Sequence, residues 1–272
     1  MAPPAAERRK VTASDITQLH RLLSSTKAGV LTPTDSGYGL TIERWSRGAE
    51  KPSGVSICPT SAEEVAIAIR YATDHEIEVA VKGGGHSTAG ASSTDGGLLI
   101  DLGRMRTVRV DVSKQQLHVQ GGCLWSDVDD AAWEHRLATV GGTVADTGVG
   151  GLTLGGGYGM LSGQRGLVID NVVAATVVLA SGKIVRASKS ENADLFWALL
   201  GAGQNFGVVT ELVLQAYPQE DVFKGTMVFL PTPETIKKLV AAVNELYHVP
   251  EGGQSKSKGR GMGLLGMASL FH

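Results

Sequence analysis

The sequence predicts a fold that mixes helices and strands and belongs to neither the Rossmann nor the P-loop class. Segments with helical spacing of apolar residues alternate with short strand-like runs. Residues 172–187 read as a β-hairpin that turns at Ser181 and Gly182. The fingerprint G-x-G-x-x-G is not found between a strand and a helix, and no G-x-x-x-x-G-K-[ST] loop occurs. These observations favour α and β elements arranged around a different kind of glycine-rich site.

The bulk composition indicates a globular protein. The chain has 272 residues, 42% of them hydrophobic, which is enough to bury a core. Its 25 basic and 27 acidic residues nearly balance, and no dense Lys/Arg cluster suggests a nucleic acid or a membrane surface as partner. No apolar run reaches the roughly 18 residues of a membrane span, and residues 1–4 lead into charge rather than into a signal peptide. We expect an intracellular, cytoplasmic protein.

The first third of the chain predicts two helices and a strand. Residues 14–23 have helical spacing, with Ser14 or Asp15 as the cap, and residues 55–58 form a strand. Ser61 and Glu64 form a capping box that starts a second helix. The residues of that helix expected to face the core are Val65, Ala68, Ile69 and Ala72.

The middle of the chain predicts a run of strands. They lie at residues 79–81, 98–102, 108–110 and 117–119. A helix begins just after Cys123 and carries acidic residues in its first turn, as a helix N-terminus favours. After the hairpin, a helix around residues 194–200 ends on Gly201, and a strand at 208–214 leads to Pro218.

Composition also suggests boundaries. We expect an N-terminal helix and arm in residues 1–50, a ligand-binding domain in 51–219, and the start of a second domain in 220–250. That start comprises a strand at 222–230 and a helix capped by Thr232, with Pro233 first and Ile236, Leu239, Val240 and Val243 on one face. Residues 251–272 have no apolar periodicity, so we expect a disordered tail.

Glycine is the outlier of the composition, with 36 residues that cluster rather than scatter. Residues 141–159 read GGTVADTGVGGLTLGGGYG. Such a stretch allows main-chain N–H groups to approach a planar or phosphorylated ligand, whereas the alternative is a set of tight turns. Ligand binding is favoured, because turns alone rarely require so many glycines.

Several polar residues have two interpretations each. His86 follows three glycines and is either a nucleophile or an ordinary histidine; Cys123 is either reactive or a small buried hydrophobe, as Cys58 is expected to be. Two cysteines in so long a chain indicate a reducing compartment without a disulfide framework. Lys82 faces a phosphate or water, and the pair at 170–171 forms a turn. The sequence offers no candidate metal site.

The order of five motifs carries a family resemblance. The motifs are Pro59-x-Ser61-x-Glu63-Glu64-Val65, Gly83-Gly84-Gly85-His86-Ser87, Gly121-Gly122-Cys123 leading to Asp127-Val128, the glycine stretch, and Asn205-Phe206-Gly207-Val208-Val209-Thr210. Through about residues 35–220 the chain resembles the berberine-bridge-enzyme-like FAD-linked oxidases of the vanillyl-alcohol-oxidase superfamily. The resemblance implies an α+β fold: a two-subdomain PCMH-type FAD-binding domain, followed by a fragment of an α+β substrate domain.

The resemblance also implies how FAD is held. It predicts two covalent bonds, from His86 to the flavin 8-methyl carbon and from Cys123 to C6, and an imidazole and a thiolate are suitable nucleophiles for an oxidised flavin. The glycine motifs would hold the pyrophosphate and flank the ring system, with Val209 near the adenine. The further cofactor-binding candidates are Gly83, Gly84, Gly85, Ser87, Gly142, Thr147, Gly148, Gly151, Gly155, Gly156 and Gly159. Lys82 stands where the family usually has Arg, which replaces a forked donor with a point charge.

The function implied is oxidation of a small organic substrate by hydride transfer to covalently bound flavin, with molecular oxygen as electron acceptor, in secondary metabolism. Family members are much longer, and their substrate domain usually supplies the catalytic base. No base can be named in this chain, which is apparently truncated in that domain. The rival hypothesis is a truncated flavin-binding protein without turnover. Neither the substrate nor the oligomeric state can be read from the sequence.

Overall fold

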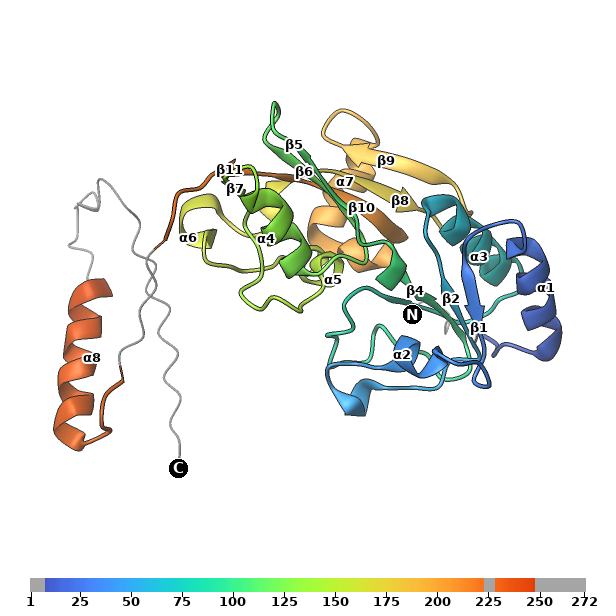
Figure 1. Cartoon of the computed structure of the whole chain (residues 1–272), viewed down its shortest axis with the longest axis horizontal. Helices are drawn as coiled ribbons and strands as arrows, with labels where there is room; N and C mark the ends of the chain where they lie inside the picture. Colours follow the sequence, from blue (N-terminus) through green and yellow to red (C-terminus); the bar gives the residue numbers. More distant parts are fainter. Residues whose placement is uncertain (1–7, 223–227, 248–272) are drawn as a thin grey trace, which may run out of the picture. The chain divides into compact units, whose positions relative to one another are not determined.

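The computed structural model describes residues 8–222 and 228–247 (Figure 1). The chain divides into two compact units, Met1–Gln219 and Glu220–His272. Each unit is described by itself below.

A mixed four-stranded sheet organises the first part of unit 1, in the order β1-β2-β4-β3. β1 is antiparallel to β2, whereas β2 and β3 both run parallel to β4. The strands are β1 (Gly29–Leu31), β2 (Val55–Cys58), β3 (Val79–Lys82) and β4 (Leu98–Asp101). Helices α1 (Ala13–Leu23) and α3 (Ala62–Asp74) lie beside this sheet (Figure 1). All four residues of β2 and of β4 are buried, as strands of a covered sheet should be.

The second sheet is antiparallel, with the order β5-β6-β10-β8-β9. Its strands are β5 (Val108–Asp111), β6 (Gln116–Gln120), β8 (Val172–Val178), β9 (Ile184–Ser188) and β10 (Val208–Gln215). The helices of this part are α4 (Trp125–Trp133), α5 (Val149–Leu154), α6 (Ser162–Arg165) and α7 (Ala193–Ala202). A small ladder pairs β7 (Leu137–Ala138) with β11 (Tyr217–Pro218). The predicted hairpin is confirmed as β8 and β9, and the α+β class is confirmed with it.

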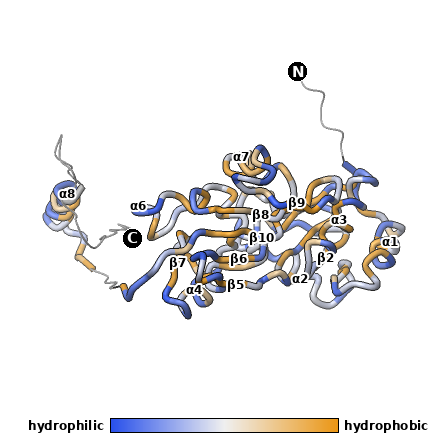
Figure 2. The backbone as a smooth tube through the Cα atoms, turned by 90° about the horizontal axis from the view of Figure 1, so that it is seen from above, coloured by the Kyte–Doolittle hydropathy of each residue, from blue (hydrophilic) through white to orange (hydrophobic). Residues whose placement is uncertain are grey.

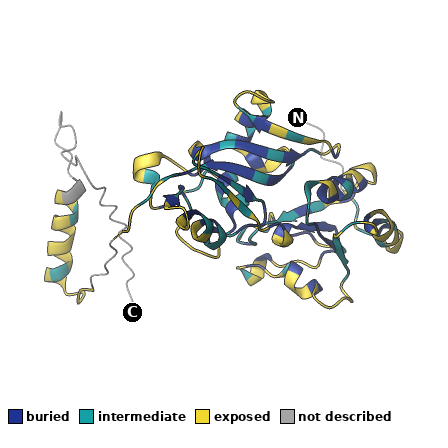
Figure 3. Ribbon diagram, turned by 45° about the horizontal axis from the view of Figure 1, so that its top comes forward, coloured by how far each residue is buried: buried dark blue, intermediate teal, exposed yellow. Residues whose placement is uncertain are grey.

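Two hydrophobic clusters fill unit 1, one for each sheet. The apolar segments follow the strands in Figure 2, and the same strands are the buried elements of Figure 3. The cluster beneath the first sheet also contains Val178 and Val208, which belong to β8 and β10 of the second. Because these strand ends pack in the first cluster and α3 also contacts β8 and β9, the two sheets pack against each other, and their connecting loops can build a common site.

Short elements complete unit 1. They are α2 (Tyr38–Ile42) and the 3₁₀ turns Arg47–Ala49, Leu102–Arg104, Ile169–Asn171 and Gly203–Asn205. Neither β1 nor α2 is predicted from the sequence, because segments of three and five residues are too short to show a period. The pair at 170–171 lies in a 3₁₀ turn, in which the Asn171 amide donates to the carbonyls of Arg165 and Leu167.

The helix starts differ from prediction in detail. The N-cap of α1 is Thr12, not Ser14 or Asp15; Asp15 is the third residue of the capping box and accepts from the Thr12 N–H. At α3 the Ser61 hydroxyl accepts from the Glu64 N–H, as predicted. The Glu64 carboxylate, however, accepts from the N–H groups of Lys27 and Thr60, so it ties the segment before β1 to the helix rather than closing the box.

The buried face of α3 is confirmed, since Val65, Ala68, Ile69 and Ala72 are all in the core. The prediction for α7 is wrong at its end: the helix passes through Gly201 and stops at Ala202.

Unit 2 contains α8 (Pro233–Tyr247), whose first residue and cap are confirmed: the Thr232 hydroxyl accepts from the Thr235 N–H at 3.2 Å. Ile236, Leu239 and Val240 on its expected apolar face are exposed. Val222 and residues 228–230 are not in a strand, contrary to prediction, and residues 223–227 and the expected tail at 251–272 lie outside the described residues. No helix in the described ranges has the length and apolar character that a membrane span requires.

Asp15 fastens α1 to the rest of unit 1. Both of its oxygens accept from the Arg9 guanidinium, at 2.7 and 2.8 Å, and the Tyr71 hydroxyl of α3 donates to it at 2.8 Å. The carboxylate is buried, and the Arg9 hydrogen bonds hold its pKa far below the usual range. Since the folded-state pKa is lowered, this stabilisation is complete above the unfolded pKa of about 3.9 and declines as the pH falls below it.

We therefore predict that Asp15→Asn lowers the free energy of unfolding by about 2 kcal/mol at neutral pH. The difference from wild type should shrink as the pH falls below about 4. Urea denaturation across this range measures it, with Asp95→Asn, an exposed partner of Lys10, as control. An equal deficit for Asp15→Asn at all pH values would contradict the assignment.

Candidate functional site

The loop of residues 83–87 leaves β3 at the end of the first sheet. Gly85 has a φ of +73°, a conformation that favours glycine, and its carbonyl accepts from the Trp45 N–H at 3.1 Å. The next residue, His86, keeps 24% of its side chain exposed. The loop thus presents an accessible imidazole beside a tightly turned backbone.

Three of the predicted motifs meet at this loop through their main chains. A side chain on Gly84 would collide with the backbone of Gly148, and one on Gly148 with that of Gly84. A Cβ on Gly83 would lie 3.2 Å from the carbonyl oxygen of Gly121, and one on Gly150 would lie 3.3 Å from the same atom. The structure therefore brings the loop, the Gly121 turn and the start of α5 into direct backbone contact.

The fifth motif joins the same junction. The Gly121 N–H donates to the Thr210 carbonyl at 2.9 Å, and a Cβ on Gly121 would lie 2.5 Å from the Val209 carbonyl oxygen. The Val209 side chain itself is buried in the core. Val209 thus reaches the site by its backbone.

Space around the glycines separates the two interpretations of the glycine stretch. Most of the glycines are needed because protein atoms fill the place of a side chain; at Gly142 the obstacle is Trp125, at Gly159 the backbone of Gly141. By contrast, nothing lies within 4 Å of a Cβ on Gly151, and only Leu167, at 3.9 Å, is near one on Gly156. Close chain packing accounts for most of the stretch, and a small open part remains for a ligand, where Gly155 is also exposed.

Cys123 lies in the core of the second sheet. Its side chain is fully buried in the hydrophobic cluster of the second sheet, and its Sγ donates to the Thr107 carbonyl at 3.5 Å. Burial, with the nearby Asp127 charge, raises the pKa of the thiol to about 12. Cys58 behaves alike, with burial raising its pKa to about 11, and both cysteines are free. The geometry of Cys123 thus matches the small buried hydrophobe of the alternative interpretation.

His86 has two neighbours that the sequence does not single out. Oδ1 of Asp146 lies 3.8 Å from Nε2 of the imidazole. The Trp45 ring stacks on the imidazole with 5.9 Å between centroids and 21° between planes. Trp45 lies outside the five motifs, and Asp146, although it is in the glycine stretch, is not one of the predicted site residues, so only their spatial neighbourhood reveals them.

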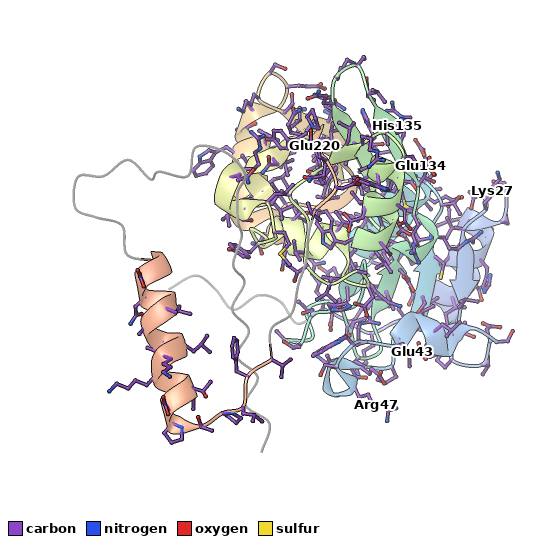
Figure 4. The ribbon with its side chains drawn as sticks, turned by 60° about the vertical axis from the view of Figure 1, so that its left-hand side comes forward. Lys27, Glu43, Arg47, Glu134, His135 and Glu220 are labelled. Carbon is purple, nitrogen blue, oxygen red and sulfur yellow. The ribbon has the colours of Figure 1, made fainter. Side chains whose placement is uncertain are left out.

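Lys82 is held by protein oxygen atoms. Its Nζ donates to the carbonyls of Leu40 and Thr41 and to Oδ2 of Asp101 at 3.1 Å. The residue therefore fastens the arm of residues 38–50 to the first sheet. The arm is the segment on which Figure 4 labels Glu43 and Arg47.

Arg44 holds the same arm from within. Its guanidinium is buried and donates to the Thr41 and Glu43 carbonyls and to both oxygen atoms of Ser92. A Cβ on Gly85 would lie 3.5 Å from its Cδ. Trp45, next in sequence, is consequently held beside the glycine loop.

Two further predicted site residues, Ser87 and Thr147, accept hydrogen bonds from main-chain N–H groups. The Ser87 hydroxyl accepts from the Ala91 N–H at 3.3 Å, and the Thr147 carbonyl accepts from the Trp125 N–H at 3.1 Å. Beneath the glycine stretch, the buried Trp125 Nε1 and Thr153 Oγ1 have no hydrogen-bond partner in the described part of the chain. No group of three or more His, Cys, Asp or Glu side chains in residues 8–222 and 228–247 is placed to hold a metal ion.

An accessible imidazole, a loop with positive φ and open glycine backbone fit a flavin dinucleotide that is held mainly by main-chain groups. Buried unpartnered polar atoms beneath the stretch also fit a site for a polar ligand. A metal-dependent site has no such support in the described residues.

Comparison with known proteins identifies the same region. A family model described as FAD binding domain matches residues 53–188, half of the chain. FAD-linked oxidoreductase pgmH of Aspergillus terreus is 39% identical over 236 residues, covering 86% of this chain and 47% of the relative. (R)-6-hydroxynicotine oxidase of Paenarthrobacter nicotinovorans is 36% identical over 228 residues, with 82% and 50% covered.

Solved structures agree with the fold. 6-Hydroxy-D-nicotine oxidase from Arthrobacter nicotinovorans superposes with a TM-score of 0.69 at 37% identity, covering 71% of this chain and 43% of that one. Glucooligosaccharide oxidase from Acremonium strictum, described with a 6-S-cysteinyl, 8α-N1-histidyl FAD, gives 0.68 at 32% identity, with 73% and 42% covered. The chain spans about half the length of the curated relatives it matches.

The backbone junction gives a direct prediction. Gly84→Ala should lower the free energy of unfolding by roughly 1–3 kcal/mol, because the new methyl group overlaps the Gly148 backbone. Gly151→Ala is the matched control, since its methyl group meets open space, and it should change the stability by less than about 0.5 kcal/mol. Urea denaturation of both variants tests the junction, and equal stability would refute it.

Proposed function

This chain belongs to the FAD binding domain family, and we propose that it is the FAD-binding part of an oxidase that oxidises a small organic substrate in secondary metabolism. The observation that carries the proposal is the match over residues 53–188, which contains the contacts among Gly83, Gly84, Gly121, Gly148 and Gly150 and the partly exposed His86. Relatives named as oxidases or FAD-linked oxidoreductases support it.

The residues that would hold FAD are those of the junction. The open main chain at Gly151 and Gly156, with the loop of residues 83–87, would contact the dinucleotide, and the exposed edge of His86 would bond to the flavin. When bound, FAD would accept a hydride from the substrate and pass the electrons to dioxygen. The protein would supply binding, orientation and the exclusion of water.

We propose one covalent bond, through His86, in place of the two implied by the family resemblance. The imidazole is partly exposed beside the loop, whereas the Cys123 thiol is fully buried. Since the nucleophile is the thiolate, a thiol pKa of about 12 leaves almost none of the reactive form at neutral pH. Cys123 would instead contribute to core packing.

The rival is a flavin-binding protein without turnover. It would account for the fact that no catalytic base is identified among residues 8–222 and 228–247. Both hypotheses require flavin and differ only in whether a substrate reduces it.

Covalent attachment provides the first test. We predict that purified protein stays yellow after denaturation and precipitation, and that Cys123→Ala retains this colour. His86→Ala should release all of its flavin, since no second bond exists. Flavin retained on denatured His86→Ala would show that the cysteine bond is real, and colourless wild-type protein would refute the covalent site.

Turnover provides the second test. With alcohols, sugars and phenolic compounds as substrate panels, the oxidase proposal predicts hydrogen peroxide release and bleaching of the flavin absorbance without oxygen. A bound flavin that no substrate bleaches would favour the rival.

A further inference from the structure

We propose that Asp146 and Trp45 position the imidazole of His86 so that its Nδ1 atom forms the bond to flavin. This inference rests on the proposed function, because it assigns how that covalent bond is made. Asp146 and Trp45 would be positioning residues, since both act through His86.

The Asp146 carboxylate occupies one edge of the ring. Its Oδ1 lies 3.8 Å from Nε2, beyond hydrogen-bond distance and near the outer limit of an ion pair. A carboxylate at this edge favours the proton on Nε2, because the contact made by one ring nitrogen decides which of the two is protonated. Nδ1 then carries the free lone pair, and it has no hydrogen-bond partner among the described residues.

The backbone around Asp146 is fixed, which makes the contact more than a chance approach of an exposed side chain. The preceding carbonyl, of Ala145, accepts from the Ser126 N–H at 2.9 Å. The following carbonyl, of Thr147, accepts from the Trp125 N–H at 3.1 Å. Both donors are at the start of α4, so the turn that carries Asp146 is attached to that helix on both sides.

Trp45 restricts the same ring from its face. The indole stacks on the imidazole, and the Trp45 N–H bond to the Gly85 carbonyl holds the residue beside His86. Trp45 nevertheless remains 68% exposed, so burial in the core does not account for its position. The Asp146 contact at the edge and the Trp45 contact on the face together restrict a flip of the imidazole ring.

The chemistry of attachment needs this arrangement. The new bond joins Nδ1 to the 8-methyl carbon of FAD; that carbon loses one C–H bond, and the imidazole finally loses its N–H proton. The two electrons released pass through the flavin to dioxygen, which takes both protons and leaves as hydrogen peroxide. While Nε2 still holds its proton, the alkylated ring is a cation, and the adjacent carboxylate stabilises that charge.

The first measurement is the rate of attachment. Full-length protein prepared without flavin is mixed with FAD, and flavin fluorescence on the denatured polypeptide is followed with time. Asp146→Ala should slow attachment about fivefold, the size expected for an exposed ion pair, and Asp146→Glu should restore most of the rate. Glu134→Gln, which removes an exposed carboxylate at the end of α4 (Figure 4), is the charge control and should match wild type.

The second measurement needs no flavin. Iodoacetamide alkylates accessible histidine, and the peptide that contains His86 reveals which nitrogen has reacted. Wild type should carry the label mainly on Nδ1, and Asp146→Ala and Trp45→Ala should move it toward Nε2.

The outcomes separate this inference from the proposed function. If wild type attaches flavin and Asp146→Ala does so at the same rate, the inference is overturned and the flavin site stands. If wild type attaches none, the covalent site falls. In that case the ratio of label on Nδ1 to label on Nε2 still tests whether Asp146 positions the ring. An identical ratio in wild type and Asp146→Ala overturns the inference.

Discussion

The contact of Gly84 with Gly148, main chain against main chain, is the constraint on which the site depends. It joins a loop of the first sheet to the segment that enters α5, at a distance that no side chain permits. Gly83, Gly121 and Gly150 extend the same junction. Because this contact sets how closely the two halves of the domain approach, it also sets where the imidazole of His86 emerges.

The arm of residues 38–50 completes the site from outside the glycine motifs. Lys82 attaches it through the Leu40 and Thr41 carbonyls, and the buried Arg44 of the arm attaches it through both oxygen atoms of Ser92. The result is that Trp45 stands against His86. Lys82, for which the sequence leaves phosphate and water open as partners, thus donates to the main chain of the segment that carries Trp45.

Burial assigns different roles to the two nucleophiles that the family resemblance places together. A histidine at the mouth of a loop keeps its ring nitrogens accessible, whereas a thiol surrounded by core residues is desolvated and holds its proton. The chemical reactivity of each side chain thus depends on whether it is buried. The order of the motifs in the sequence does not reveal how far each side chain is buried.

The sequence by itself determined the main strands and helices, the hairpin, and the glycine motifs around His86, because period, capping residues and glycine clusters are local signals. It also indicated the flavin family, which the match over residues 53–188 shows. Thr12 as the cap of α1 and the engagement of Glu64 with Lys27 were missed, since several nearby residues could fill each role. Only the tertiary structure decided that Cys123 is buried, that Lys82 binds the arm, and that Asp146 and Trp45 flank His86. These facts depend on segments that meet in space while lying 40 to 60 residues apart in the chain, a distance over which local sequence pattern carries no information.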